Sequence, residues 1–394
     1  MAKAGNQGLV RINNQNAIIE YIRDHGPVSR ADLSKILKIS KPTVSTNVEA
    51  LLQRNILLEV GPGTTSIGKK PTLLEFNKNH KLVLACDLSR EHPYIALGNL
   101  IGDILAESKV QILDAQKSSV NHEAFICALD SMFEGVFFDK TWVDQVVIAS
   151  PGIFPDHEAQ QLLNPQFTHL QAVKIDNLLE SYFGKQVQVH NDINMAALGE
   201  HQFGAGKGYS NLVYVSVGLG VGAGLIINDE LYLGSRKAAG EIGFVIPLTS
   251  KNVSGSIVNL ENTIGERAIE QRLAEEAKIS TEFSVFEKSM TPSYELFVDA
   301  VLNKDPLCCQ LATDNINHLA MAMANVSVVL DFECIIVGGS ILSLGENYIK
   351  QLDALVNVVT PLETRVVASK LRSAEIYGAI KVGIDSIFKG LVIQ

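Results

Sequence analysis

The segment LACDLSREHPYIALGNLIGDILAE, residues 84–107, decides the fold class. An apolar run ends at Asp87, a charged turn follows, and two further apolar-rich runs are separated by Gly102 and Asp103. This alternation predicts strand, turn, strand, turn, strand. The turn after Asp87 lies where nucleotide-binding proteins often place a phosphate or metal site, so its residues bear directly on function.

Strand and helix patterns alternate through the rest of the chain and predict an α/β fold. Further buried strands are expected within 143–154, 186–204, 211–234 and 333–342. The glycines at 218, 220, 222 and 224 superficially resemble a dinucleotide-binding fingerprint. That motif requires a helix after the glycines, whereas LIIN at 225–228 continues as strand. We interpret the glycines as a hairpin beside a ligand cleft.

Length and composition indicate a globular protein with more than one domain. A chain of 394 residues suits two or three domains, and 46% hydrophobic with 19% charged residues is ordinary for globular proteins. No apolar run approaches the roughly 18 residues that span a bilayer, and the N-terminus has no secretory apolar core. We expect a cytoplasmic protein that binds no membrane. The five cysteines form no C-x-x-C pair and are expected to be reduced and buried.

Residues 1–80 predict a winged helix-turn-helix. Helical patterns cover 14–25, 29–39 and 40–55. Ser29 and Asp32 have capping-box spacing, and Ser40 is the candidate cap of the third helix, with Pro42 in its first turn. Two strands around a glycine-rich tip follow and predict the wing.

The third helix and the wing carry the residues expected to contact DNA. Short polar side chains and a lysine suit a helix in the major groove, and a basic wing tip suits a minor groove or a phosphate. The expected contacts are Lys41, Thr43, Ser45 and Thr46 on the helix face, with Asn47 beside them, and Lys69 and Lys70 in the wing. Residues 1–80 hold 11 Lys/Arg and 6 Asp/Glu, whereas the whole chain carries −10. Only this segment is therefore expected to meet a polyanion. The alternative is a small helical interaction domain with a solvated polar face.

Asn191 and Asp192 are the first candidates for a ligand site. They stand at the end of an expected strand, and the carboxyl ends of strands line the ligand crevice in α/β sheets. The Asp192 carboxylate can accept a hydrogen bond from a sugar hydroxyl or act as a base toward it. The same carboxylate can also cap the helix that follows, because capping uses only one of its two oxygens. Glu241 and Glu261 are further candidates, although each alone is more often a solvated or capping residue.

Together these residues resemble the ROK family of repressors and sugar kinases, and within it the xylose-repressor type. The resemblance covers essentially the whole chain and is carried by ISKPTVSTNVEALLQRNILLEVGPGTTSIGKKPTLLEFNK, NDINMAALGE and AAGEIGF. It implies a winged helix-turn-helix over 1–80 and a two-lobed, actin-like ATPase fold over 81–394. Lobe one would span about 81–193 plus the C-terminal helix, and lobe two about 194–374.

The resemblance also implies a set of sugar-binding residues. They are Gly152, Asn164, Asn191, Asp192, Glu241 and Glu261. Asp192 takes the position of the kinase base, and the glycines at 218–224 and 338–339 match segments that flank ATP in the kinases.

The first departure from the family is at the phosphate turn. Kinase members have Asp-x-Gly-Gly-Thr there, and its amides and hydroxyl cradle phosphate. The present turn is Asp87-Leu88-Ser89-Arg90-Glu91, without either glycine and with an added carboxylate. We interpret it as a former phosphate loop and expect no kinase activity and no catalytic residue.

The second departure is at the zinc module. Family members usually have a His and then a Cys-x-Cys-Gly-x-x-Gly-Cys run that bind one zinc. Phe244 stands at the His position, and NVSGSIVNLE at 252–261 contains no cysteine. We expect no metal or other cofactor, and apolar packing of Phe244, Ile257 and Val258 instead.

The favoured hypothesis is a DNA-binding transcriptional regulator, a repressor of carbohydrate-utilisation genes. Its partners would be operator DNA, a carbohydrate effector bound between the lobes, and further copies of the chain in a homodimer or dimer of dimers. The effector would shift the population of lobe arrangements and so the spacing of the DNA-binding heads. Two alternatives stay open: an ATP-dependent sugar kinase with Asp192 as base, and a regulator whose ligand pocket has decayed.

Overall fold

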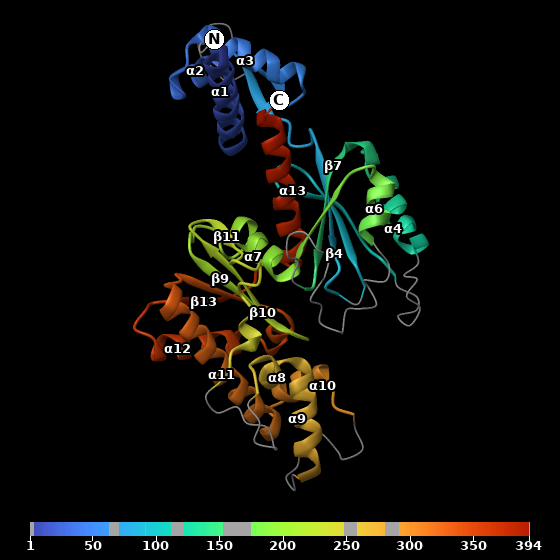
Figure 1. Cartoon of the computed structure of the whole chain (residues 1–394), viewed down its shortest axis with the longest axis vertical. Coiled ribbons are helices and arrows are strands. Elements are labelled where there is room, and N and C mark those ends of the chain that lie inside the picture. Colours follow the sequence, from blue (N-terminus) through green and yellow to red (C-terminus); the bar gives the residue numbers. More distant parts are fainter. Residues whose placement is uncertain are drawn as a thin grey trace.

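The computed structural model describes residues 4–62, 71–90, 92–111, 122–152, 175–247, 258–279 and 291–393. These residues build three sheets, which follow one another along the molecule (Figure 1). We call the part with the small N-terminal sheet the head and the remainder the body.

The head contains three helices and a three-stranded sheet of order β1-β3-β2. Its elements are α1 Ala4–His25, β1 Val28–Ser29, α2 Arg30–Ile36, α3 Lys41–Gln53, β2 Leu57–Pro62 and β3 Thr72–Phe76. Ser29 Oγ accepts from the Asp32 backbone N–H at 3.1 Å and donates to its carboxylate at 2.7 Å, and Ser40 Oγ accepts from the Thr43 N–H at 3.4 Å. The predicted caps, helices and wing strands are therefore confirmed, although α1 begins ten residues earlier than the pattern from residue 14 indicated.

The first body sheet has the order β6-β5-β4-β7-β8. Its strands are β4 Leu82–Asp87, β5 Tyr94–Gly98, β6 Ile104–Lys109, β7 Val143–Ser150 and β8 Val187–Asn191. β4, β5 and β6 pair antiparallel, as residues 84–107 predicted, whereas β7 and β8 run parallel to β4.

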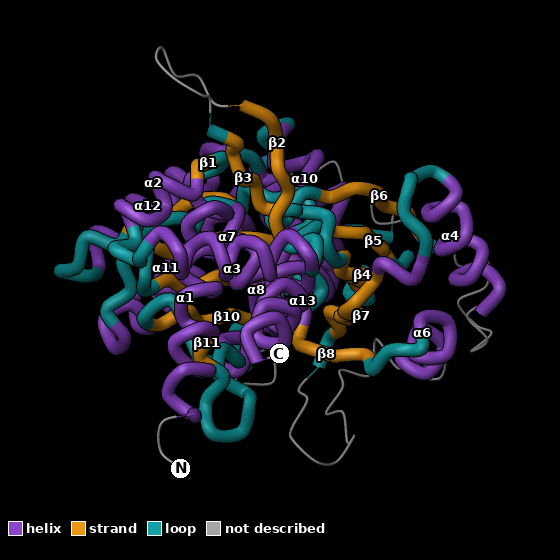
Figure 2. The backbone as a smooth tube through the Cα atoms, turned by 90° about the horizontal axis from the view of Figure 1, so that it is seen from above, coloured by secondary structure: helices purple, strands orange, loops and turns teal. Residues whose placement is uncertain are grey.

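Two layers of helices cover this sheet. Side chains of β4 alternate: Leu84 packs in a cluster with Phe125 of α4, whereas Val83 packs with Ile380 of α13. The helices are α4 His122–Glu134 and α6 Ile175–Phe183 on one face and α13 Ala374–Ile393 on the other, with the short η1 at Lys140–Trp142. Figure 2 shows α4 and α6 on the outer side of the sheet, away from α13.

The second body sheet has the order β11-β10-β9-β12-β13. Its strands are β9 Leu212–Val217, β10 Val221–Ile227, β11 Glu230–Tyr232, β12 Cys334–Gly338 and β13 Arg365–Ala368. Its other elements are η3 Ile242–Phe244, α8 Glu261–Ile264, α9 Glu266–Ile279, α10 Tyr294–Leu302, α11 Pro306–Leu330, η4 Ser340–Leu344 and α12 Glu346–Val359. The glycine segment forms a hairpin between β9 and β10, as predicted, and the chain continues as strand.

Helix α7, Asp192–Phe203, packs between the second sheet and α13. The two helix backbones nearly touch, because a Cβ on Gly378 would lie 1.8 Å from the Met195 carbonyl oxygen and one on Gly199 2.1 Å from that of Ala374. From this crossing α13 extends to the head (Figure 1), where the Leu391 carbonyl accepts from the guanidinium of Arg54, the residue that follows α3. Within the described residues, no helix has the length and apolarity needed to span a membrane.

Candidate functional site

The start of α7 brings three of the expected sugar-binding residues together. Asn191 Oδ1 accepts from the Asn194 N–H at 2.9 Å and so caps the helix. Its amide nitrogen donates to the Gly152 carbonyl at 3.0 Å and to Asp192 Oδ1 at 3.2 Å. The prediction that Asp192 caps the helix is therefore wrong. Asn191 fills that position, and the Asp192 carboxyl accepts hydrogen bonds from the backbone N–H groups of Asp192 and Ile193.

The Asp192 carboxyl lies in an acidic environment. Desolvation, followed by the charges of Asp87 and Glu375, raises its pKa to about 7. Burial and the charge of Asp87 likewise raise the pKa of Glu375 to about 7. Three carboxyl groups from β4, α7 and α13 thus converge beside the end of the first sheet. A hydroxyl donor placed here would find strong acceptors.

Glu241 and Glu261 form a second group, near the start of β10. Glu261 Oε2 accepts from the Val221 N–H at 3.0 Å. Glu241 is exposed overall, but desolvation of its carboxyl and the charge of Glu261 raise its pKa. The structure therefore places the expected sugar-binding residues in two groups. Asn164 lies outside the described residues.

The glycines of the hairpin serve the packing of the protein itself. A Cβ on Gly222 would lie 2.5 Å from Ile193 Cδ1, and one on Gly224 would lie 2.6 Å from Ala197 Cβ. Both contacts are with α7. A Cβ on Gly220 would stand 3.2 Å from Glu261 Oε2. The glycines thus allow α7 and Glu261 to approach β10 closely.

The turn after β4 is closed by its own side chains. Asp87 is fully buried, and its Oδ1 accepts from the Ser89 N–H at 2.9 Å and from Ser89 Oγ at 2.6 Å. Arg90 Nε donates to Asp87 Oδ2 at 2.9 Å. The Arg90 Nη2 then reaches Ser373 Oγ at 3.2 Å and Glu375 Oε2 at 3.5 Å. Arg90 therefore ties this turn to the first turn of α13.

Sequence reasoning missed Glu375 and Ser373. The only local signal was Arg90, three residues after the buried Asp87, because a charged arginine at such a position needs a further hydrogen-bond acceptor. Nothing in the sequence indicated that this partner lies 285 residues away.

The residues around Phe244 do not fit the family's zinc. The His position is occupied by Phe244, and 252–261 contains no cysteine. In the part of the chain that the structure describes, no group of three or more His, Cys, Asp or Glu side chains has the arrangement of a metal site. The expected apolar packing of Phe244 is wrong, because its side chain is 69% exposed and the neighbouring Ile246 is 60% exposed. Ile257 lies outside the described residues.

The outward face of α3 presents most of the expected DNA-contacting residues. Lys41, Ser45 and Thr46 are exposed, and Thr43 is half-buried with its hydroxyl 2.8 Å from Ser40 Oγ. Asn47 is a correction: it is 3% exposed and donates to the Thr43 carbonyl at 2.8 Å. It lies three residues after Val44 and therefore faces the core. Lys69 and Lys70 lie outside the described residues.

A winged helix-turn-helix joined to an actin-like, two-lobed body defines the class of protein. The sequence model of the ROK family matches residues 83–381, and that of the winged helix-turn-helix DNA-binding family matches 13–57. The chain belongs to the ROK family.

Several known proteins are similar to this chain. A xylose repressor from Caldicellulosiruptor bescii is 26% identical over 90% of this chain and 89% of its own length. A solved ROK family transcriptional regulator, a homologue of the Escherichia coli MLC protein, matches 98% of both chains with a TM-score of 0.76 at 21% identity. A ROK family glucokinase from Streptomyces griseus, solved with glucose and AMPPNP, matches 76% of this chain and 98% of its own with a TM-score of 0.61 at 22% identity.

Proposed function

We propose that this protein is a sugar-responsive, DNA-binding transcriptional repressor. The observation that carries the proposal is the course of α13, which starts at the carboxylates beside Asp192 and ends against the DNA-binding head. The similarity to a xylose repressor makes xylose the first sugar to test. We also propose the domain division given above, with a head over 1–80 and a two-lobed body over 81–394.

DNA binding is assigned to the head. Lys41, Thr43, Ser45 and Thr46 would enter the major groove, and Lys69 and Lys70 of the wing would reach phosphates or the minor groove. Because one head reads only a short site, we propose a homodimer or dimer of dimers that reads repeated half-sites.

Sugar binding is assigned to these two groups of residues. Gly152, Asn164, Asn191 and Asp192 would hold the sugar from lobe one, and Glu241 with Glu261 from lobe two. A ligand that contacts both groups binds one lobe arrangement better than others and so shifts the population toward it.

The contact between α13 and the head is mainly apolar. The rings of Phe388 and Phe76 stack with centroids 5.9 Å apart, and the Arg23 guanidinium carbon lies 5.2 Å from the Phe388 centroid. The Arg54 guanidinium donates to the Leu391 carbonyl at 3.5 Å. These contacts join the end of α13 to α1, α3 and β3, so a movement of α13 reaches the head.

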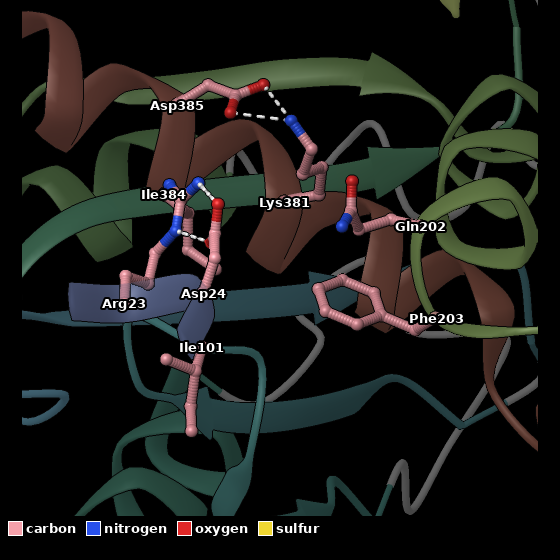
Figure 3. A pocket seen from close by; sticks show the side chains of 8 residues that line it. All are labelled: Arg23, Asp24, Ile101, Gln202, Phe203, Lys381, Ile384 and Asp385. Carbon is pink, nitrogen blue, oxygen red and sulfur yellow. Dashed lines mark hydrogen bonds and ion pairs between the residues drawn. The ribbon is translucent and has the colours of Figure 1, made fainter. Parts of the chain in front are cut away.

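A cavity of about 400 Å³ lies at this junction (Figure 3). It is lined by Arg23, Asp24, Ile101, Gln202, Phe203, Lys381, Ile384 and Asp385. Two ion pairs border it, Arg23 with Asp24 at 2.8 Å and Lys381 with Asp385 at 2.6 Å, and each lies within one helix. Neither of these two pairs crosses between the head and the body.

The test combines sugar binding with DNA binding. Thermal unfolding is measured with xylose and with a panel of pentoses, hexoses, amino sugars and their phosphates. A ligand at 100 times its Kd stabilises the folded state by about 2.7 kcal/mol. We expect one sugar class to stabilise the protein and to lower its affinity for duplexes selected from a random-sequence pool. Asp192→Asn should abolish the sugar response and keep DNA binding. The matched control is Asp176→Asn, an exposed aspartate in the first turn of α6.

Other outcomes would favour the alternatives. ADP release with a sugar and ATP would establish the kinase, with Asp192 as its base. If the protein binds DNA but no sugar changes its thermal stability or its DNA affinity, its ligand pocket has decayed. An unchanged sugar response in Asp192→Asn would overturn the site assignment.

A further inference from the structure

A second cavity, of about 250 Å³, lies beside the turn that follows β4. It is lined by Arg90, His92, Tyr94, Lys109, Arg372 and Ser373. Three separate segments supply these residues: the turn into β5, the end of β6, and the approach to α13. Four of the six side chains are basic types, on a chain whose net charge is −10.

Pairing within the fold positions the lining residues. Tyr94 and Lys109 are direct cross-strand partners in the β5–β6 pair. The Arg90 guanidinium carbon lies 5.8 Å from the Tyr94 ring centroid, and its Nη2 donates to Ser373 Oγ. The charge of Arg372 also acts on the Tyr94 phenol, so Arg372 reaches the same space.

The nearby carboxylates compensate only part of this positive charge. Asp87 and Glu375 pair with Arg90, and Glu107 accepts from the Tyr94 hydroxyl. Among the described residues, neither Lys109 nor Arg372 makes an ion pair within 4.0 Å, and both are exposed. Within the described residues, two cations without an ion pair therefore line the cavity, and the Arg90 side chain is itself 41% exposed.

We propose that this cavity binds a phosphate-bearing anion, as an effector site separate from the sugar-binding residues. Guanidinium and ammonium groups that converge from several sides suit the oxygens of a dianion. The Ser373 hydroxyl adds a neutral hydrogen-bonding group to the same site. Inorganic phosphate and the phosphate of a sugar phosphate share this chemistry.

The site is placed to influence α13. Arg372 and Ser373 immediately precede the first residue of that helix, and Arg90 is shared between the cavity and Glu375 in its first turn. An anion that draws on Arg90 competes with Glu375 for the same guanidinium. Occupancy would therefore change how the start of α13 is held, and α13 ends at the head.

The test measures binding of inorganic phosphate by the full-length protein. Calorimetric titration is run at constant ionic strength against chloride and sulfate, because exposed charges are screened by salt. The variants are Arg372→Gln and Lys109→Gln, with Lys185→Gln, another exposed lysine of the body, as the matched control. We expect saturable binding in the parent and in Lys185→Gln, and at least about tenfold weaker binding in the other two, equivalent to about 1.4 kcal/mol.

Further experiments distinguish inorganic phosphate from a sugar phosphate as the ligand, and the phosphate site from the sugar site. Glucose 6-phosphate is compared with glucose and with inorganic phosphate, which shows whether the sugar part adds affinity. Asp192→Asn should keep the phosphate response even where it loses a sugar response, so either proposal can fail alone. The phosphate site is overturned if phosphate and glucose 6-phosphate both fail to bind, or if all three charge variants bind phosphate equally. In the second case the binding is a non-specific charge effect or lies in the DNA-binding head.

Discussion

The two ends of α13 are held by opposite kinds of interaction. Its first turn is fixed by charge, because Arg90 bridges Asp87 and Glu375 beside Asp192. Its last turns are held by aromatic contacts: the Phe388 ring stacks with Phe76 and makes a cation–π contact with Arg23. The charged end can respond to a ligand or to pH, whereas the apolar end depends on shape and contact area. Between them, α13 crosses α7 at close range through Gly378 and Gly199.

The largest effect is expected at that crossing, where Gly378→Ala should destabilise the protein by about 3 kcal/mol. The added Cβ would lie 1.8 Å from a backbone carbonyl of α7, so one helix must move. Urea unfolding measures the change. The matched control is Gly390→Ala in the same helix, where a Cβ meets nothing within 4 Å. Because alanine is the better helix former, the control should be neutral or slightly stabilising. Equal effects of the two changes would show that the helices do not need this close approach.

The charged end is tested by Arg90→Gln, which should cost about 2 kcal/mol of unfolding free energy near neutral pH. Removing one partner of a buried pair costs about 3–5 kcal/mol, and partial exposure of Arg90 reduces that cost. Arg365→Gln, a change at an exposed arginine of the second sheet, should leave the unfolding free energy near its parent value.

The pH dependence of this loss has a definite sign. The pKa of Glu375 is raised to about 7 in the folded state, above its ordinary value. Its contribution to stability is therefore fully present below about pH 4 and is lost as the pH rises through 7. Without the Arg90 guanidinium the ionised form is penalised further, so the deficit of Arg90→Gln should be larger at about pH 8 than at about pH 5. A deficit that grows toward acid pH would contradict this account of the cluster.

The same contrast explains how much the sequence could predict. The caps at Ser29 and Ser40 and the three strands within 84–107 depend on neighbouring residues, and all are confirmed. Asn47 was predicted on the DNA-facing side of α3 because it is polar, although its spacing from Val44 places it on the core side. The Arg90–Glu375 pair joins residues far apart in sequence, which no local pattern indicates. Exposure of Phe244 was equally hidden, since hydrophobicity alone predicts burial. The DNA and sugar contacts stay predictions.

The smallest stability effect is expected at the apolar end. Phe388→Leu keeps most of the apolar area but removes the ring stack with Phe76 and the cation–π contact with Arg23, at a cost of about 1 kcal/mol. Phe137→Leu, at a side chain that is 93% exposed, is the control.

The functional effect of Phe388→Leu should exceed its effect on stability. If α13 transmits the sugar signal through this contact, the variant binds xylose or the active sugar as before but changes its DNA affinity less when that sugar is added. Coupling energies of this kind are typically about 1–3 kcal/mol, so a loss of half is measurable by fluorescence anisotropy. Linkage supplies a second measurement: DNA must then change the sugar affinity of the variant by the same reduced factor. If Phe388→Leu shows the expected stability loss but the sugar still changes its DNA affinity by the full factor, the Phe388 contact does not transmit the signal. The signal would then reach the head through the cavity that Phe203 of α7 and Arg23 both line.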